Sequence, residues 1–114
     1  PPAWVFGPVW TTLYALMGIA AFLIWQKGWE RKEVKLALGA FCLQLFLNAS
    51  WSIVFFGLQS PGLALLNILA LWLAIVWTIV VFYRISLPAA YLLLPYILWT
   101  SFAAYLNYAI WILN

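Results

Sequence analysis

Apolar residues run along almost the whole chain in four long blocks, which short polar or proline-containing segments separate. Each block is about 19 residues long or longer, which is enough for a helix to cross a hydrocarbon core of about 30 Å. The pattern predicts helices over about residues 8–26, 34–56, 62–83 and 87–111. We therefore expect an all-α membrane protein in which a single domain, residues 1–114, forms an antiparallel bundle of four transmembrane helices.

Glycine and proline positions set the expected ends and bends of these helices. Residues 1–7 are expected to form a loop or an interfacial segment, and Pro8 suits the first turn of the first helix, where its missing N–H needs no partner. The second helix should stop at Gly57. Pro95 lies inside the fourth helix, where it removes a backbone hydrogen bond, so we expect a kink one turn before Trp99.

Composition and charge placement support a membrane location. Of the 114 residues 69% are hydrophobic and 6% are charged, whereas a soluble domain carries roughly 25% charged residues. The links after the first and third predicted helices hold all the charged residues, which are Lys27, Glu30, Arg31, Lys32, Glu33, Lys35 and Arg84. With four spans these links share one side, and the excess of basic residues predicts that this side is cytoplasmic.

One stripe of polar and aromatic residues interrupts the apolar second helix. Gln44, Asn48, Trp51 and Ser52 recur at i, i+4, i+7 and i+8, which places them on one helix face. Polar side chains at membrane depth face protein, a cavity or a ligand. For Trp51 the two polar neighbours favour a pocket, whereas hydrogen bonding between helices remains the alternative for the two amides.

The chain lacks most groups that carry enzyme or metal chemistry. It has no histidine and no carboxylate within a predicted span, and Cys42 and Met17 are solitary. This composition argues against a metal centre, haem ligation, general acid–base catalysis and proton-coupled transport. The net charge of +3 makes no basic surface for nucleic acid. Asn67 and Asn107 are as ambiguous as the amides of the second helix.

Three segments resemble the TspO/translocator protein family, also known as tryptophan-rich sensory proteins or peripheral benzodiazepine receptors. The motifs are PPAWVFGPVWTTLYALMG at residues 1–18, QxxxNxxWSxxFFG at 44–57 and LPYxxWxxFxxxLNY at 94–108. Members of that family have five membrane helices. The resemblance therefore implies that these four helices correspond to helices two to five, and that the chain is a fragment lacking the first transmembrane helix.

The resemblance implies a membrane-embedded translocator or sensory protein that binds a porphyrin. The expected ligand is protoporphyrin IX or a related tetrapyrrole in a tryptophan-lined pocket, with no further cofactor and no metal. We also expect the protein to reside in a lipid bilayer, that of a bacterial cell membrane. The resemblance implies that it forms a homodimer there. Carried over by position, the ligand-binding residues are Trp10, Tyr14, Asn48, Trp51, Trp99, Ala103 and Leu106.

Two alternative functions remain, of which the first follows from the resemblance and the second is permitted by the chain length and the number of spans. One is an enzyme that degrades protoporphyrin oxidatively or in light, with Trp10 and Trp99 as candidate catalytic residues. The other is a small transporter of lipophilic compounds, against which the absence of an intramembrane carboxylate argues. The family's cholesterol motif is incomplete, because Ile112 follows Trp111 where a basic residue is required. We therefore expect no cholesterol binding.

Overall fold

The computed structural model describes residues 3–113, and their side chains from residue 7 onward. The elements are α1 (Ala3–Trp25), α2 (Lys32–Ser52), the π-helical turn η1 (Ile53–Gly57), α3 (Pro61–Tyr83), α4 (Leu87–Leu92) and α5 (Leu94–Leu113). They form four spans that are long and apolar enough to cross a membrane, with α2 continuing into η1 and α4 into α5. The predicted all-α membrane bundle is thereby confirmed.

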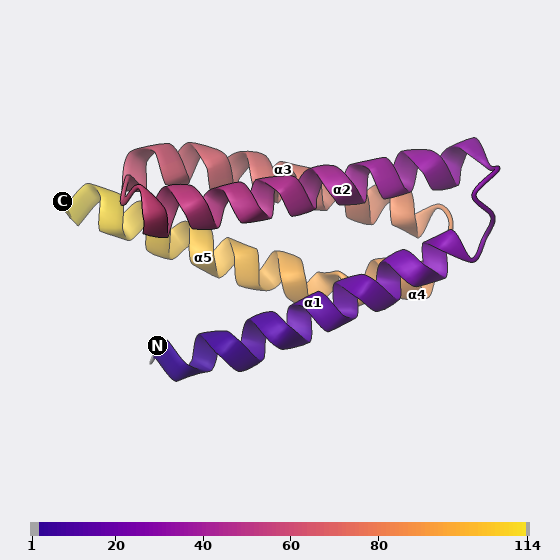
Figure 1. Cartoon of the computed structure of the whole chain (residues 1–114), viewed down its shortest axis with the longest axis horizontal. Helices are drawn as coiled ribbons and strands as arrows, with labels where there is room; N and C mark the ends of the chain where they lie inside the picture. Colours follow the sequence, from indigo (N-terminus) through magenta and orange to yellow (C-terminus); the bar gives the residue numbers. More distant parts are fainter. Residues whose placement is uncertain (1–2, 114) are drawn as a thin grey trace.

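The four spans run antiparallel, so the links fall alternately at the two ends of the bundle (Figure 1). The links after α1 and α3 lie at one end, and the turn between η1 and α3 lies at the other, where the chain also starts and finishes. All charged side chains therefore lie at one end of the bundle, which agrees with the prediction that the two charged links share one side. There the Lys35 ammonium lies 5.9 Å from the ring centre of Trp29, and Arg31 pairs with Glu33.

The first helix starts earlier than predicted. α1 begins at Ala3, so Pro8 lies inside it and residues 3–7 are helical, not a loop. A proline near a helix start removes only the hydrogen bond to the carbonyl four residues earlier, and the remaining turns continue unbroken. The second span ends at Gly57 as expected, although its last turn is π-helical, with the Leu58 N–H bonded to the Ile53 carbonyl at 3.0 Å.

The fourth span is interrupted, but not where the sequence predicted. The helix breaks at Leu93, nearly two turns before Trp99, and α5 then starts with Pro95 in its first turn. The Leu93 N–H bonds the Ala90 carbonyl at 3.1 Å, a tighter turn than an α-helix makes. Because a proline disfavours the helical conformation of the residue before it and clashes with the carbonyl four residues back, the helix restarts and does not bend smoothly.

The core lies where α3 packs against both α2 and α5. Ala37, Ala40 and Ala64 are fully buried there, and such small side chains let helix backbones approach closely. Phe41 and Phe82 stack at 6.0 Å between ring centres. By contrast, α1 contacts mainly α4 and α2, and it diverges from α5 toward the N-terminus (Figure 1).

Candidate ligand-binding cavity

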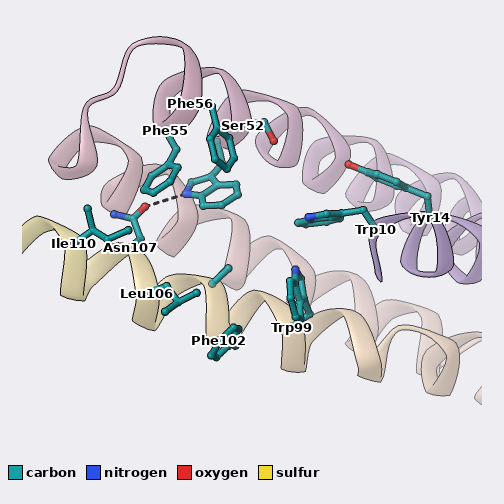
Figure 2. Close-up of a pocket in the computed structure, with 12 residues that line it drawn as sticks. Trp10, Tyr14, Ser52, Phe55, Phe56, Trp99, Phe102, Leu106, Asn107 and Ile110 are labelled. Carbon is teal, nitrogen blue, oxygen red and sulfur yellow. Dashed lines mark hydrogen bonds between the residues drawn. The ribbon is translucent and has the colours of Figure 1, made fainter. Parts of the chain in front are cut away.

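A cavity of about 510 Å³ lies between α1, the end of α2 with η1, and α5 (Figure 2). Its walls are formed by Trp10, Tyr14, Trp51, Ser52, Phe55, Phe56, Trp99, Phe102, Ala103, Leu106, Asn107 and Ile110. This volume falls in the range of about 300–1,000 Å³ that small-molecule sites occupy. Seven of the twelve walls are aromatic, so the surface on offer consists mainly of flat π faces.

Two aromatic side chains of α1 form one end of the cavity. Trp10 and Tyr14 are one helical turn apart, which puts them on the same face, and their rings stack at 5.6 Å with an angle of 30°. Trp10 also meets Trp99 of α5 edge to face, at 6.4 Å and 89°. These contacts connect α1 to α5 in the region where the two helices diverge.

The opposite end of the cavity is fixed by one hydrogen bond from Trp51 and one from Asn107. Its indole N–H donates to the Asn107 side-chain oxygen at 2.9 Å, and the Asn107 amide donates to the Pro61 carbonyl at 2.8 Å. The Trp51 ring stacks on Phe55 at 5.2 Å, and Phe56 meets it edge-on at 5.9 Å. The wider π-helical turn places Phe55 and Phe56 beside Trp51, so the irregular backbone shapes this wall.

A buried chain of hydrogen bonds lies behind Tyr14. The Tyr14 hydroxyl donates to the Asn48 side-chain oxygen at 2.7 Å, and the Asn48 amide donates to the Tyr96 hydroxyl at 2.8 Å. Tyr96 in turn donates to the Gln44 side-chain oxygen at 2.6 Å, and the Gln44 amide lies 4.0 Å from the Met17 sulfur. Both amides of α2 therefore make interhelical hydrogen bonds, which was one of the two alternatives that the sequence left open.

The structure brings six of the seven predicted ligand-binding residues to this one cavity, and Asn48 is the exception. Asn48 is 2% exposed and lies behind Tyr14. A ligand would therefore meet Tyr14 before it met the Asn48 amide. That these residues bind a ligand stays a prediction.

Sequence reasoning missed several of the cavity walls. On α5, a period of three and four residues from Trp99 leads through Ala103 and Leu106 to further lining residues, so extending it would have identified Phe102, Asn107 and Ile110. Phe55 and Phe56 are brought in by the π-helical turn, which the sequence did not reveal. Tyr96 had no evident role, because its partners lie on another helix.

The cavity holds no charge among its described walls, and its polar groups are few. The Trp51 N–H and the Asn107 amide already bond within the protein. The described part of the chain contains no group of three metal-ligating side chains. This arrangement can hold a flat, largely apolar molecule between aromatic faces and orient it with a few hydroxyl groups.

The fold and the cavity define a multi-pass, tryptophan-rich membrane protein with an aromatic internal site. The sequence model of the TspO/MBR family matches residues 1–112, and the chain belongs to that family. It is 48% identical over 114 residues to the tryptophan-rich protein TspO of Chlorobaculum tepidum, covering all of this chain and 72% of that protein. The protein of the same name from Archaeoglobus fulgidus is 50% identical over 115 residues, with the same coverage. The translocator protein of Homo sapiens is 43% identical over 113 residues, covering 97% of this chain and 66% of that protein.

Proposed function

We propose that this protein binds a porphyrin or a related flat tetrapyrrole in the cavity and acts as a membrane translocator or sensor for it. One observation carries the proposal: tryptophans from three separate spans, Trp10, Trp51 and Trp99, wall a single cavity of about 510 Å³. A flat, mostly apolar macrocycle fits between such faces, because aromatic rings favour stacked and edge-on contacts. The name of one relative, translocator protein, supports the translocator part of the proposal.

The test is a titration with protoporphyrin IX, followed by quenching of tryptophan fluorescence in detergent or lipid nanodiscs. We expect saturable binding that Trp10→Leu weakens at least tenfold. The lost stacking contributes about 0.5–1.5 kcal/mol beyond the apolar area, which adds roughly 25 cal/mol per Å², and about 1.4 kcal/mol suffices for a tenfold change.

Trp77→Leu is the matched control. Trp77 lies on α3, is 42% exposed and does not line the cavity. Its loss removes the same number of tryptophans and the same bulk, but it should leave the affinity within about twofold, since roughly 0.4 kcal/mol separates affinities that differ by this factor. Equal losses in both variants would contradict a specific cavity site, and a titration without saturation would contradict tetrapyrrole binding altogether.

A second candidate function is oxidative or light-dependent breakdown of protoporphyrin. The observation that favours it is the edge-to-face contact of Trp10 and Trp99 at 6.4 Å on the cavity wall, where both indoles would touch a bound pigment. The chemistry would belong mainly to the pigment and dioxygen, with the tryptophans relaying an oxidising equivalent. Illumination of the complex in air tests this function. A new pigment that forms with the native protein, but not with Trp99→Phe, would support it, and an unchanged absorption spectrum would contradict it.

A further inference from the structure

We infer that Tyr14 presents a hydrogen-bond acceptor, and not a donor, to the cavity. The protein should therefore prefer a ligand whose polar edge offers an N–H or O–H group at this position. This inference rests on the proposed function, since it requires a tetrapyrrole in the cavity. It concerns which chemical form of that ligand binds better, which the proposed function leaves open.

The direction of the buried hydrogen-bond chain carries the inference. A side-chain amide oxygen only accepts hydrogen bonds, so the Gln44 oxygen must receive the proton of the Tyr96 hydroxyl, 2.6 Å away. With its proton committed, Tyr96 accepts from the Asn48 amide nitrogen at 2.8 Å. The Asn48 oxygen then faces Tyr14 and takes the proton of its hydroxyl at 2.7 Å. Each step fixes the next, from the interior outward to the cavity.

Met17 selects this direction over the reverse one. If the whole chain were inverted, Gln44 would turn its oxygen toward Met17 and Tyr14 would be left with a free proton. A thioether sulfur has no proton to give, so the inverted chain would set two acceptors against each other. In the observed orientation the Gln44 amide nitrogen faces the sulfur at 4.0 Å, a weak but favourable contact. Met17 is 1% exposed, so water cannot reach this position to donate a hydrogen bond to an inverted Gln44 oxygen.

Tyr14 carries this direction to the cavity wall. Its side chain is 46% exposed, and it lies beside Trp10 at one end of the site (Figure 2). Because its proton is committed to Asn48, the phenolic oxygen can only accept from a ligand. Hydrogen bonds in a chain polarise one another, which makes such an oxygen a stronger acceptor. A neutral amide, an alcohol or a protonated acid on the ligand edge would donate a hydrogen bond to this oxygen. An ester or a carboxylate has only acceptor oxygens, which the phenolic oxygen would repel.

A matched pair of probes tests this preference. The primary diamide and the dimethyl ester of protoporphyrin IX are both neutral, and only the diamide can donate at its edge. We expect the ratio of the ester Kd to the diamide Kd to be about two- to tenfold higher in the native protein than in Tyr14→Phe. This is the change in affinity that one net hydrogen bond produces. Dividing by the Tyr14→Phe ratio removes the general difference in solvation between the two probes.

Two outcomes would overturn the inference, and they are distinguishable from a failure of the proposed function. Equal ratios in both proteins would show that Tyr14 makes no such bond, and a lower ratio in the native protein would show that it donates. In either case both probes still bind, so tetrapyrrole binding stands. If neither probe binds, the proposed function fails and the inference with it.

Met17→Leu tests the origin of the direction. Leucine keeps the size and apolar character of the side chain, so the fold should be retained. Without the sulfur, nothing favours the orientation in which the Gln44 amide nitrogen faces residue 17. The ratio of the ester Kd to the diamide Kd, divided by the same ratio in Tyr14→Phe, should therefore fall toward one. A ratio that stays at the native value would show that Met17 does not set the direction of the chain.

Discussion

The hydroxyl of Tyr96 accepts a hydrogen bond from the Asn48 amide at 2.8 Å, and this bond joins α5 to α2 inside the bundle. Both side chains are at most 2% exposed. The large helix interfaces lie elsewhere, between α3 and its neighbours α2 and α5. Like the Trp51–Asn107 bond, the Tyr96 hydroxyl therefore connects directly two helices that meet mainly through α3, and it does so behind the cavity wall.

Tyr96→Phe should destabilise the ligand-free protein more than Tyr14→Phe does. Removing the Tyr96 hydroxyl leaves the Asn48 amide and the Gln44 oxygen without partners in the interior, at a cost of about 1–3 kcal/mol. Removing the Tyr14 hydroxyl frees only the Asn48 oxygen, on the side toward the cavity. Thermal unfolding in one detergent measures both variants. A larger loss for Tyr14→Phe would show that the centre of the network lies elsewhere.

Asn48→Leu separates an interhelical amide from one that binds a ligand directly. Both polar ends of Asn48 bond protein groups, so we expect the free energy of unfolding of the ligand-free protein to fall by about 1–3 kcal/mol. The porphyrin affinity of the fraction that stays folded should fall less, because the aromatic walls remain. Unchanged thermal stability together with a large loss of affinity would instead identify Asn48 as a direct ligand contact.

Trp51 and Asn107 should be energetically coupled. Trp51→Phe removes the indole N–H but keeps an aromatic face, and Asn107→Leu removes its acceptor at 2.9 Å. A double-mutant cycle on thermal unfolding should give a coupling of about 0.5–2 kcal/mol, as for other contacting polar pairs. The pair Trp72 and Ser101, whose 2.8 Å bond lies on the outer face of the bundle, provides the reference value for a bond within the spans that lines no cavity. A coupling of zero between Trp51 and Asn107 would show that their bond does not hold the cavity wall in place.

The sequence alone predicted the parts of the fold that depend on local pattern. Four apolar blocks gave four spans, and the confinement of charge to residues 27–35 and Arg84 required those spans to alternate in direction. The cavity walls at Trp10 and Trp99 came from a family resemblance, which carries positional information that periodicity lacks. Helix periodicity showed that Asn48 shares a face with Trp51, but not which helix that face would meet.

What the sequence did not predict depends on contacts between distant residues. Asn48 and Tyr96 are 48 positions apart, and their meeting is set by how far α5 is shifted along α2. The break at Leu93 provides part of that shift, and a proline two residues later signals a disturbance without fixing its place. The π-helical turn at Ile53–Gly57 has no distinct sequence signal, although it positions two cavity walls.

Pro95→Ala should join α4 and α5 into one helix. Alanine supplies a backbone N–H where proline has none, and it favours the helical conformation. A continuous helix would rotate the residues beyond it, so Tyr96 would lose its alignment with Gln44 and Trp99 would shift in the cavity. We expect weaker porphyrin binding with the fold retained. The same affinity as the native protein would show that the break at Leu93 does not position these residues.

Single-cysteine labelling should place both charged links on the cytoplasmic side of the membrane. Basic residues near short loops favour that side, and the structure puts the links after α1 and α3 at one end of the bundle. The exposed Cys42 is first replaced by alanine, and cysteine is then introduced at Lys27, Arg84 or Ser60. Lys27 is preferable to the neighbouring Gly28, because a residue with a side chain would be strained at the Gly28 φ of +118°. A membrane-impermeant maleimide should label Ser60→Cys in intact cells, whereas Lys27→Cys and Arg84→Cys should react only after the membrane is opened.

Labelling of Lys27→Cys and Arg84→Cys from opposite sides would contradict the four-span topology. Labelling of both from outside would reverse the orientation while leaving the bundle as described.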